Sequence, residues 1–253
     1  MKKVFYSVLA LACTVFTANA QEEAEGFKAK SGDVAVELGL SGGILNTASN
    51  LNSSNSGSLP SMLKVRYFLN DKMAVRASFN FSSVSEKSKV YDTDNNGNDT
   101  KTSGYQKLSN GFYGFNLGVE KHFKGTNRLA TYLGGDLTLA IKSAKLVEEK
   151  YHNGGYDEDY SKTIKGTNAN GNGGFGFGLR AVTGAEYYFV KKAYIGLEAG
   201  WGFLSMKDSR VKSSVTTPDG TGLKTVTKDS NSPGGSFQLV PAITGSVRIG
   251  YIF

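Results

Sequence analysis

Apolar and polar residues alternate with a period of two in eight separate segments of this chain. This period is typical of a β-strand whose two faces meet different environments, because successive side chains point to opposite sides. Beyond residue 20, no segment keeps a helical period or contains the roughly 18 consecutive apolar residues of a transmembrane helix. The chain is therefore predicted to be all-β, with strands in residues 33–40, 63–69, 73–81, 113–123, 133–141, 175–189, 195–203 and 237–253.

The connections between these segments also alternate, in length. Short connections follow the second, fourth and sixth segments, and connections of 22 to 33 residues, rich in Ser, Asn, Gly and Lys, follow the others. A soluble sandwich has no reason to collect its long loops at one end, whereas a membrane barrel has short periplasmic turns and long external loops. The predicted fold is an eight-stranded antiparallel up-and-down transmembrane β-barrel with four long external loops and short periplasmic turns.

The alternation alone does not say which face points outward, and a soluble lipocalin-like barrel would turn the apolar face inward. Two features favour a membrane. The polar face is dominated by glycine and by charges of both signs, and the whole chain contains 32 glycines. Large aromatic residues gather near both strand ends, as the two interfaces of a bilayer select. The outer band is Phe81, Tyr113, Phe175, Phe203 and Phe237, and the inner band is Tyr67, Phe123, Phe189, Tyr251 and Phe253.

The amino terminus has the pattern of a secretory signal peptide. Lys2 and Lys3 precede a short apolar stretch, and Ala18-Asn19-Ala20 forms a small-residue cleavage site. Lipoprotein processing at Cys13 is the alternative, but the residues before this cysteine match that signal poorly. The predicted organisation is a signal peptide at 1–20, a short periplasmic segment at 21–31 and the barrel at 32–253.

Ten charged residues, five acids and five bases, fall on the polar face of the predicted strands. An eight-stranded barrel leaves a lumen just wide enough for side chains to fill, and unpaired charges there are costly. We expect a salt-bridged network that closes the lumen; a narrow polar conduit lined by the same residues remains the alternative. The ten residues are Glu37, Lys64, Arg66, Arg76, Glu120, Asp136, Arg180, Glu186, Glu198 and Arg248.

Enzymatic and metal sites receive little support from the sequence. A hydrolase at the outer membrane edge needs a histidine beside a nucleophile or an acid there, but His122 falls at the inner end of a strand and His152 lies in a loop. Asp92–Asp99 begins like a calcium loop, yet Ser103 stands where the bidentate glutamate belongs. We therefore predict no catalytic residue, no cofactor and no metal site. Basic and acidic residues are interspersed, so no nucleic-acid partner is expected either.

The carboxyl terminus carries a family resemblance. Val247, Ile249, Tyr251 and Phe253 form an alternating apolar series with a terminal phenylalanine, which resembles the sorting signal of bacterial outer-membrane barrels. With the signal peptide and eight strands, the chain is similar to the small OmpA-like and OmpX-like barrels, also called porin-family proteins. The resemblance implies a place in the bacterial outer membrane, contact with its lipid, and insertion by the outer-membrane assembly machinery. We expect no periplasmic peptidoglycan-binding domain of the kind that full OmpA carries.

The expected function is non-enzymatic. It is envelope-structural, or it is the binding of an unidentified extracellular ligand through the external loops. Passive permeation of small solutes is the alternative, and lipid or peptide hydrolysis is a distant third.

Overall fold

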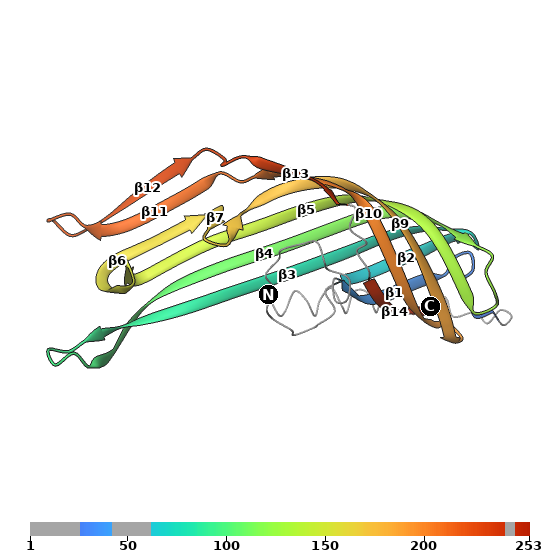
Figure 1. The fold of residues 1–253 in the computed structure, drawn as a ribbon, viewed down its shortest axis with the longest axis horizontal. Helices are drawn as coiled ribbons and strands as arrows, with labels where there is room; N and C mark the ends of the chain where they lie inside the picture. The colour runs from blue at the N-terminus through green and yellow to red at the C-terminus, as the bar shows by residue number, and fades with distance from the viewer. Residues whose placement is uncertain (1–25, 42–61, 241–245) are drawn as a thin grey trace.

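The computed structural model describes residues 26–41, 62–240 and 246–253 and places most of them in β-strands (Figure 1). No helix in these ranges is long and apolar enough to cross a membrane. The strands are β1 (Val34–Ser41), β2 (Met62–Asn70), β3 (Met73–Thr93), β4 (Asp99–Phe123), β5 (Leu129–His152), β6 (Gly155–Lys165), β7 (Thr167–Asn168), β8 (Gly171–Asn172), β9 (Gly174–Val190), β10 (Ala193–Asp208), β11 (Val211–Pro218), β12 (Leu223–Ser230), β13 (Gly235–Val240) and β14 (Ser246–Ile252).

Eight antiparallel strands pair into a closed ring. From β1 the pairing runs through β2, β3, β4, β5, β9, β10 and β14, and β14 pairs with β1 again. Each of the eight segments predicted from the sequence supplies one ring strand. The last predicted segment is divided, because β13 pairs with the outer part of β10 and only β14 closes the ring.

The pairing register fixes how far the ring strands tilt. From Asn80 of β3, the register passes through β2, β1 and β14 to Gly196 of β10. In the other direction, through β4, β5 and β9, it arrives at Met206 of the same strand, ten residues farther along. For eight strands this offset corresponds to a tilt of roughly 40° from the ring axis, and it leaves an interior that side chains can fill.

The two faces of the ring are reversed relative to a soluble protein. Large apolar side chains point outward and are exposed, as at Leu38 (47%) and Leu197 (62%). Their neighbours along the strands, Glu37 and Glu198, point inward and are buried. The polar face therefore lines the interior, which is the orientation predicted from the glycines and charges of that face.

The end of the ring with the short turns is filled by a compact core. The segment before β1 lies against this end: the amide of Gly32 donates to the carbonyl of Phe68, and the Ser31 hydroxyl donates to that of Leu69. The side chain of Phe27 packs against the core. Alanine and aromatic side chains and one isoleucine, from the ring and from this segment, make up the core: Ala29, Ala35, Phe68, Ala74, Ala130, Tyr188, Tyr194 and Ile252.

The long connections differ from the loops expected from the sequence. β3 and β4 continue far beyond the ring and are separated only by residues 94–98, and β5 and β6 form a second long hairpin. With β11 and β12 these strands make an extended sheet that projects from one side of the ring (Figure 1). The prediction of loops was wrong for these segments because both faces of the strands are polar, which hides the period of two. The connection at 42–61 lies outside the described residues.

The inward glycines make room for large side chains, which leads to a first prediction. A Cβ atom on Gly250 would collide with the ring of Tyr194, whose hydroxyl is held by Glu37 and Arg66. Gly250→Ala is expected to lower the free energy of unfolding in lipid vesicles by about 1–3 kcal/mol, measured by urea titration. Gly135→Ala is the control, because its Cβ meets nothing closer than 3.8 Å. Equal stability of the two variants would contradict the packing described.

Candidate functional site

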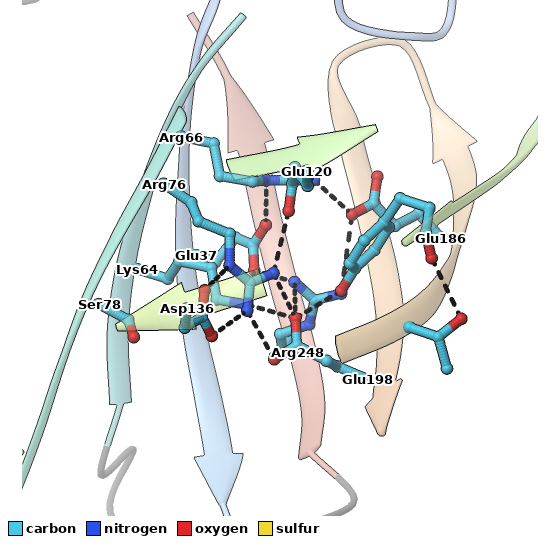
Figure 2. A network of polar contacts seen from close by, with 12 residues as sticks. Glu37, Lys64, Arg66, Arg76, Ser78, Glu120, Asp136, Glu186, Glu198 and Arg248 are labelled. Carbon is cyan, nitrogen blue, oxygen red and sulfur yellow. Dashed lines mark hydrogen bonds and ion pairs between the residues drawn. The ribbon is translucent and has the colours of Figure 1, made fainter. Parts of the chain in front are cut away.

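The ten charged residues singled out in the sequence lie together inside the ring (Figure 2 shows nine of them, with Ser78). Every one of the eight ring strands contributes at least one of them. Nine are buried, and Arg180 is the exception, with 24% of its side chain exposed. We call this set the charge cluster. Its members come from opposite walls and point toward one another, so it spans the interior.

Arg66 is the centre of the inner half of the charge cluster, which is the half nearer the short turns. Its Nε atom lies 2.6 Å from Glu37 Oε1, and its Nη1 atom lies 2.8 Å from Glu120 Oε1 and 2.7 Å from Glu186 Oε1. Arg66 itself is fully buried. One guanidinium therefore neutralises carboxylates from three strands, which ties β1, β4 and β9 to β2 across the interior.

Arg76 plays the same part in the outer half. It binds Asp136 with two parallel hydrogen bonds, Nε to Oδ1 at 2.7 Å and Nη2 to Oδ2 at 2.8 Å. Its Nη1 atom also reaches Glu120 at 3.0 Å and Glu198 at 2.9 Å. Arg180 donates to the same Asp136 at 2.7 Å. The outer half is thus a chain of shared carboxylates with no isolated charge.

Lys64 and Arg248 link the two halves. The Lys64 ammonium lies 2.7 Å from Glu198 and 3.9 Å from Glu37. Arg248 Nη1 donates to Glu37 at 2.5 Å, and its Nη2 atom donates to the Tyr132 hydroxyl at the same distance. With five acids and five bases, the charge cluster is formally neutral.

Three buried tyrosines hydrogen-bond to the charge cluster but were not singled out from the sequence. Tyr132 donates to Glu198 at 2.6 Å, Tyr194 to Glu37 at 2.7 Å, and Tyr188 to Glu186 at 3.1 Å. Tyr132 and Tyr194 also accept hydrogen bonds from arginines. The strand parity could have identified them, because all three stand on the inward positions of their strands.

The layers on either side of the charge cluster are uncharged or nearly so. On the inner side, His122 is buried with its Nε2 atom 2.9 Å from Glu120, and its ring lies against those of Phe68 and Tyr132. On the outer side, Asn116 donates to the Ser78 hydroxyl and accepts from Thr138. His122 is thus part of the packing at the inner end of the ring.

The energetics of this arrangement favour rigidity. Removing one partner of a buried ion pair leaves an uncompensated charge and costs several kcal/mol, whereas a fully paired network roughly balances its desolvation. Every member forms ion pairs with at least two others, so none can rotate away alone without breaking at least two of these contacts. Such a cluster fills the interior and holds the eight strands in register.

The other candidate residues lie apart from the charge cluster. His152, near the turn between β5 and β6, stacks on Tyr160 and lies 3.3 Å from Asp157, where both partners are well exposed. Within the described ranges, no three His, Cys, Asp or Glu side chains are arranged to hold a metal ion. Of the proposed sorting residues, Val247, Ile249 and Tyr251 are exposed on the outward face of β14, and Phe253, just after this strand, is exposed as well. The predicted signal peptide at 1–20 lies outside the described residues.

The calcium-like segment is a self-contained turn. Asp94 Oδ1 accepts hydrogen bonds from the amides of Asn96 and Asn98, at 2.9 and 2.8 Å. The backbone hydrogen bond from Asn98 is the main reason why the pKa of Asp94 is lowered. The second carboxylate of the calcium-like motif, that of Asp94, thus serves to close the tip of the hairpin.

Breaking the charge cluster should be costly. Arg66→Ala leaves Glu37, Glu120 and Glu186 short of their main cation and is expected to lower the free energy of unfolding by about 3–5 kcal/mol, measured by urea titration in vesicles. Lys121→Ala, at an exposed position near the same end of the ring, should change it by no more than about 0.5 kcal/mol. A loss below about 1 kcal/mol for Arg66→Ala would contradict the assignment.

Calcium should leave the protein unaffected. Because Asp94 is occupied by its own turn, millimolar calcium is expected to produce no larger shift in melting temperature than magnesium at equal concentration. A rise specific to calcium that Asp94→Asn abolishes would instead establish a site at the hairpin tip.

Comparisons with known proteins identify the family. The outer membrane protein OprG from Pseudomonas aeruginosa has a similar solved structure, with 12% identity and a TM-score of 0.39 over 90% of this chain and 99% of that one. The outer membrane protein AlkL is similar at 13% identity and a TM-score of 0.29 over 93% and 96% of the two chains. No curated protein matches the sequence. The model of the Putative OmpA-OmpF-like porin family matches residues 48–202, more than half of the chain, so this bacterial outer-membrane protein belongs to that family.

Proposed function

We propose that this protein is a non-conducting, non-enzymatic barrel of the outer membrane, which stabilises the envelope and presents its extended sheet to the exterior. The observation that carries the proposal is the charge cluster, because ten mutually paired residues from all eight strands fill the interior. The aromatic core beneath it adds a second obstruction at the end with the short turns.

The orientation in the membrane follows from the two ends of the ring. The short turns and the segment 26–31 belong on the periplasmic side, since a chain exported through the inner membrane reaches the outer membrane from there. The long hairpins β3–β4 and β5–β6 then project outside the cell. In this proposal, residues 1–20 are the signal peptide, 21–31 the periplasmic segment and 32–253 the barrel. The carboxyl-terminal series on β14 directs insertion by the assembly machinery.

Passive permeation of small solutes is the second candidate, and two observations favour it. The family is described as a porin family. In addition, Arg180 is the one partly exposed member of the charge cluster, and glycines occupy the inward positions beside it, at Gly178 and Gly202. A path through the outer half would run past Arg180 and then require Lys64 or Arg66 to move.

Conductance in planar bilayers separates the two candidates. The wild-type protein is expected to give no unit conductance after insertion, which flotation of vesicles and a heat-dependent shift on a denaturing gel would verify. Steady conductance steps whose ion selectivity changes in Arg180→Gln, but not in Lys121→Gln, would overturn the proposal and establish the permeation path. The control removes the same charge at an exposed position near the inner rim.

A further inference from the structure

The outward face of the extended sheet carries a group of exposed lysines that the proposed closure of the ring does not use. They come from five neighbouring strands, β3, β4, β5, β6 and β11, and we call them the lysine patch. Its members are Lys87, Lys107, Lys145, Lys165 and Lys212.

The register places these lysines directly beside one another. Lys87 pairs with Lys107, Lys145 pairs with Lys165, and Lys165 in turn pairs with Lys212. Like charges directly opposite each other on neighbouring strands destabilise a sheet. A row of three lysines across three strands is therefore unfavourable unless an anion lies among them.

Few acids share this face to compensate the lysines. Lys212 lies 3.7 Å from Asp229, and it is the one member of the patch, within the described ranges, that forms an ion pair. Glu149 is engaged by the Tyr105 hydroxyl at 2.6 Å. The ammonium of Lys87 lies 3.7 Å from the centre of the Tyr105 ring, which holds it on this face. The patch thus keeps a net positive charge.

The lysine patch continues the surface that faces lipid. Lys87 lies six residues beyond Phe81 on β3, and Lys145 lies four residues beyond Ile141 on β5, so each shares the outward face of an exposed apolar residue. At about 3.4 Å per residue and a tilt of roughly 40°, the patch stands roughly 10–15 Å beyond the aromatic band. The patch therefore stands outside the hydrocarbon core, on the polar side of the aromatic band.

Hydroxyl groups occupy the space between the aromatic band and the lysines. Ser85 and Ser109 lie opposite each other with their hydroxyl oxygens 3.2 Å apart, and Ser143 lies on the same face of β5. Hydroxyl and ammonium donors on one face suit the oxygen atoms of a phosphate group. Because the apolar surface continues directly below, a ligand with both a phosphate and acyl chains fits this face better than a free anion or a nucleic acid.

We propose that the lysine patch binds the phosphate groups of the phosphorylated glycolipid in the outer leaflet. The inference rests on the proposed orientation, with the extended sheet outside the cell, and it names a partner for that sheet. The lipid would neutralise the opposed lysines and anchor the long hairpins to the membrane surface.

Binding to purified rough lipopolysaccharide tests the inference, with the folded protein in a neutral detergent at low ionic strength. Lys107→Gln/Lys145→Gln/Lys165→Gln is expected to bind about a hundredfold more weakly than wild type, since each lysine near an anionic surface contributes about a factor of five. The control Lys72→Gln/Lys121→Gln/Lys124→Gln removes the same charge at the opposite end of the ring and should bind like wild type. A heat-dependent gel shift verifies that each variant is folded.

Changing the ligand tests whether the patch requires phosphate groups that are carried on a lipid. Lipopolysaccharide stripped of phosphate should bind as weakly as the patch variant, and inorganic phosphate should not compete at millimolar concentration. Equal weakening in both triple variants, or undiminished binding of the stripped lipid, would overturn the inference. Stronger binding of single-stranded DNA than of lipopolysaccharide would overturn it as well. Protease treatment of intact cells tests the orientation separately, because cleavage within residues 94–98 requires the β3–β4 hairpin to lie outside the cell. If this hairpin is cleaved but the protein does not bind the lipid, only the present inference is refuted and the proposed orientation stands.

Discussion

The paired charges inside the ring are the interaction on which the rest of the structure depends. Burying nine ionised side chains, with Arg180 partly exposed, is tolerable only because each carboxylate is shared by at least two basic side chains from other strands. This sharing requires all eight strands to be present and in register. The closed ring and the ion pairs inside it therefore stabilise each other, and neither is expected to form without the other.

The same constraint explains where the apolar and small residues lie. Because the interior holds the charges, the apolar side chains must point outward, and only a membrane makes that arrangement stable. Arginine and tyrosine side chains are long, so glycines stand beside them: a Cβ at Gly184 would collide with the ring of Tyr132. The abundance of glycine and the low mean hydropathy of −0.28 both follow from this interior.

Much of this could be predicted from the sequence, because a period of two shows directly when the two faces of a strand differ. All eight ring strands, and the inward position of residues such as Arg66, follow from parity. The inward tyrosines were harder to recognise, since Tyr188 and Phe68 each stand beside an outward aromatic residue and the contrast between the faces disappears. The extended hairpins were missed for a related reason, as both of their faces carry mainly polar residues. Which acid pairs with which base depends on register across the ring, which no local pattern contains.

Proton exchange of the arginine side chains tests most directly whether the interior is closed and dry. In the protein reconstituted in lipid, nuclear magnetic resonance should resolve the Nε–H signals of Arg66 and Arg248 with exchange much slower than that of Arg180, whose side chain is partly exposed. Exchange as fast at Arg66 as at Arg180 would show that water passes through the charge cluster, and would contradict a closed interior.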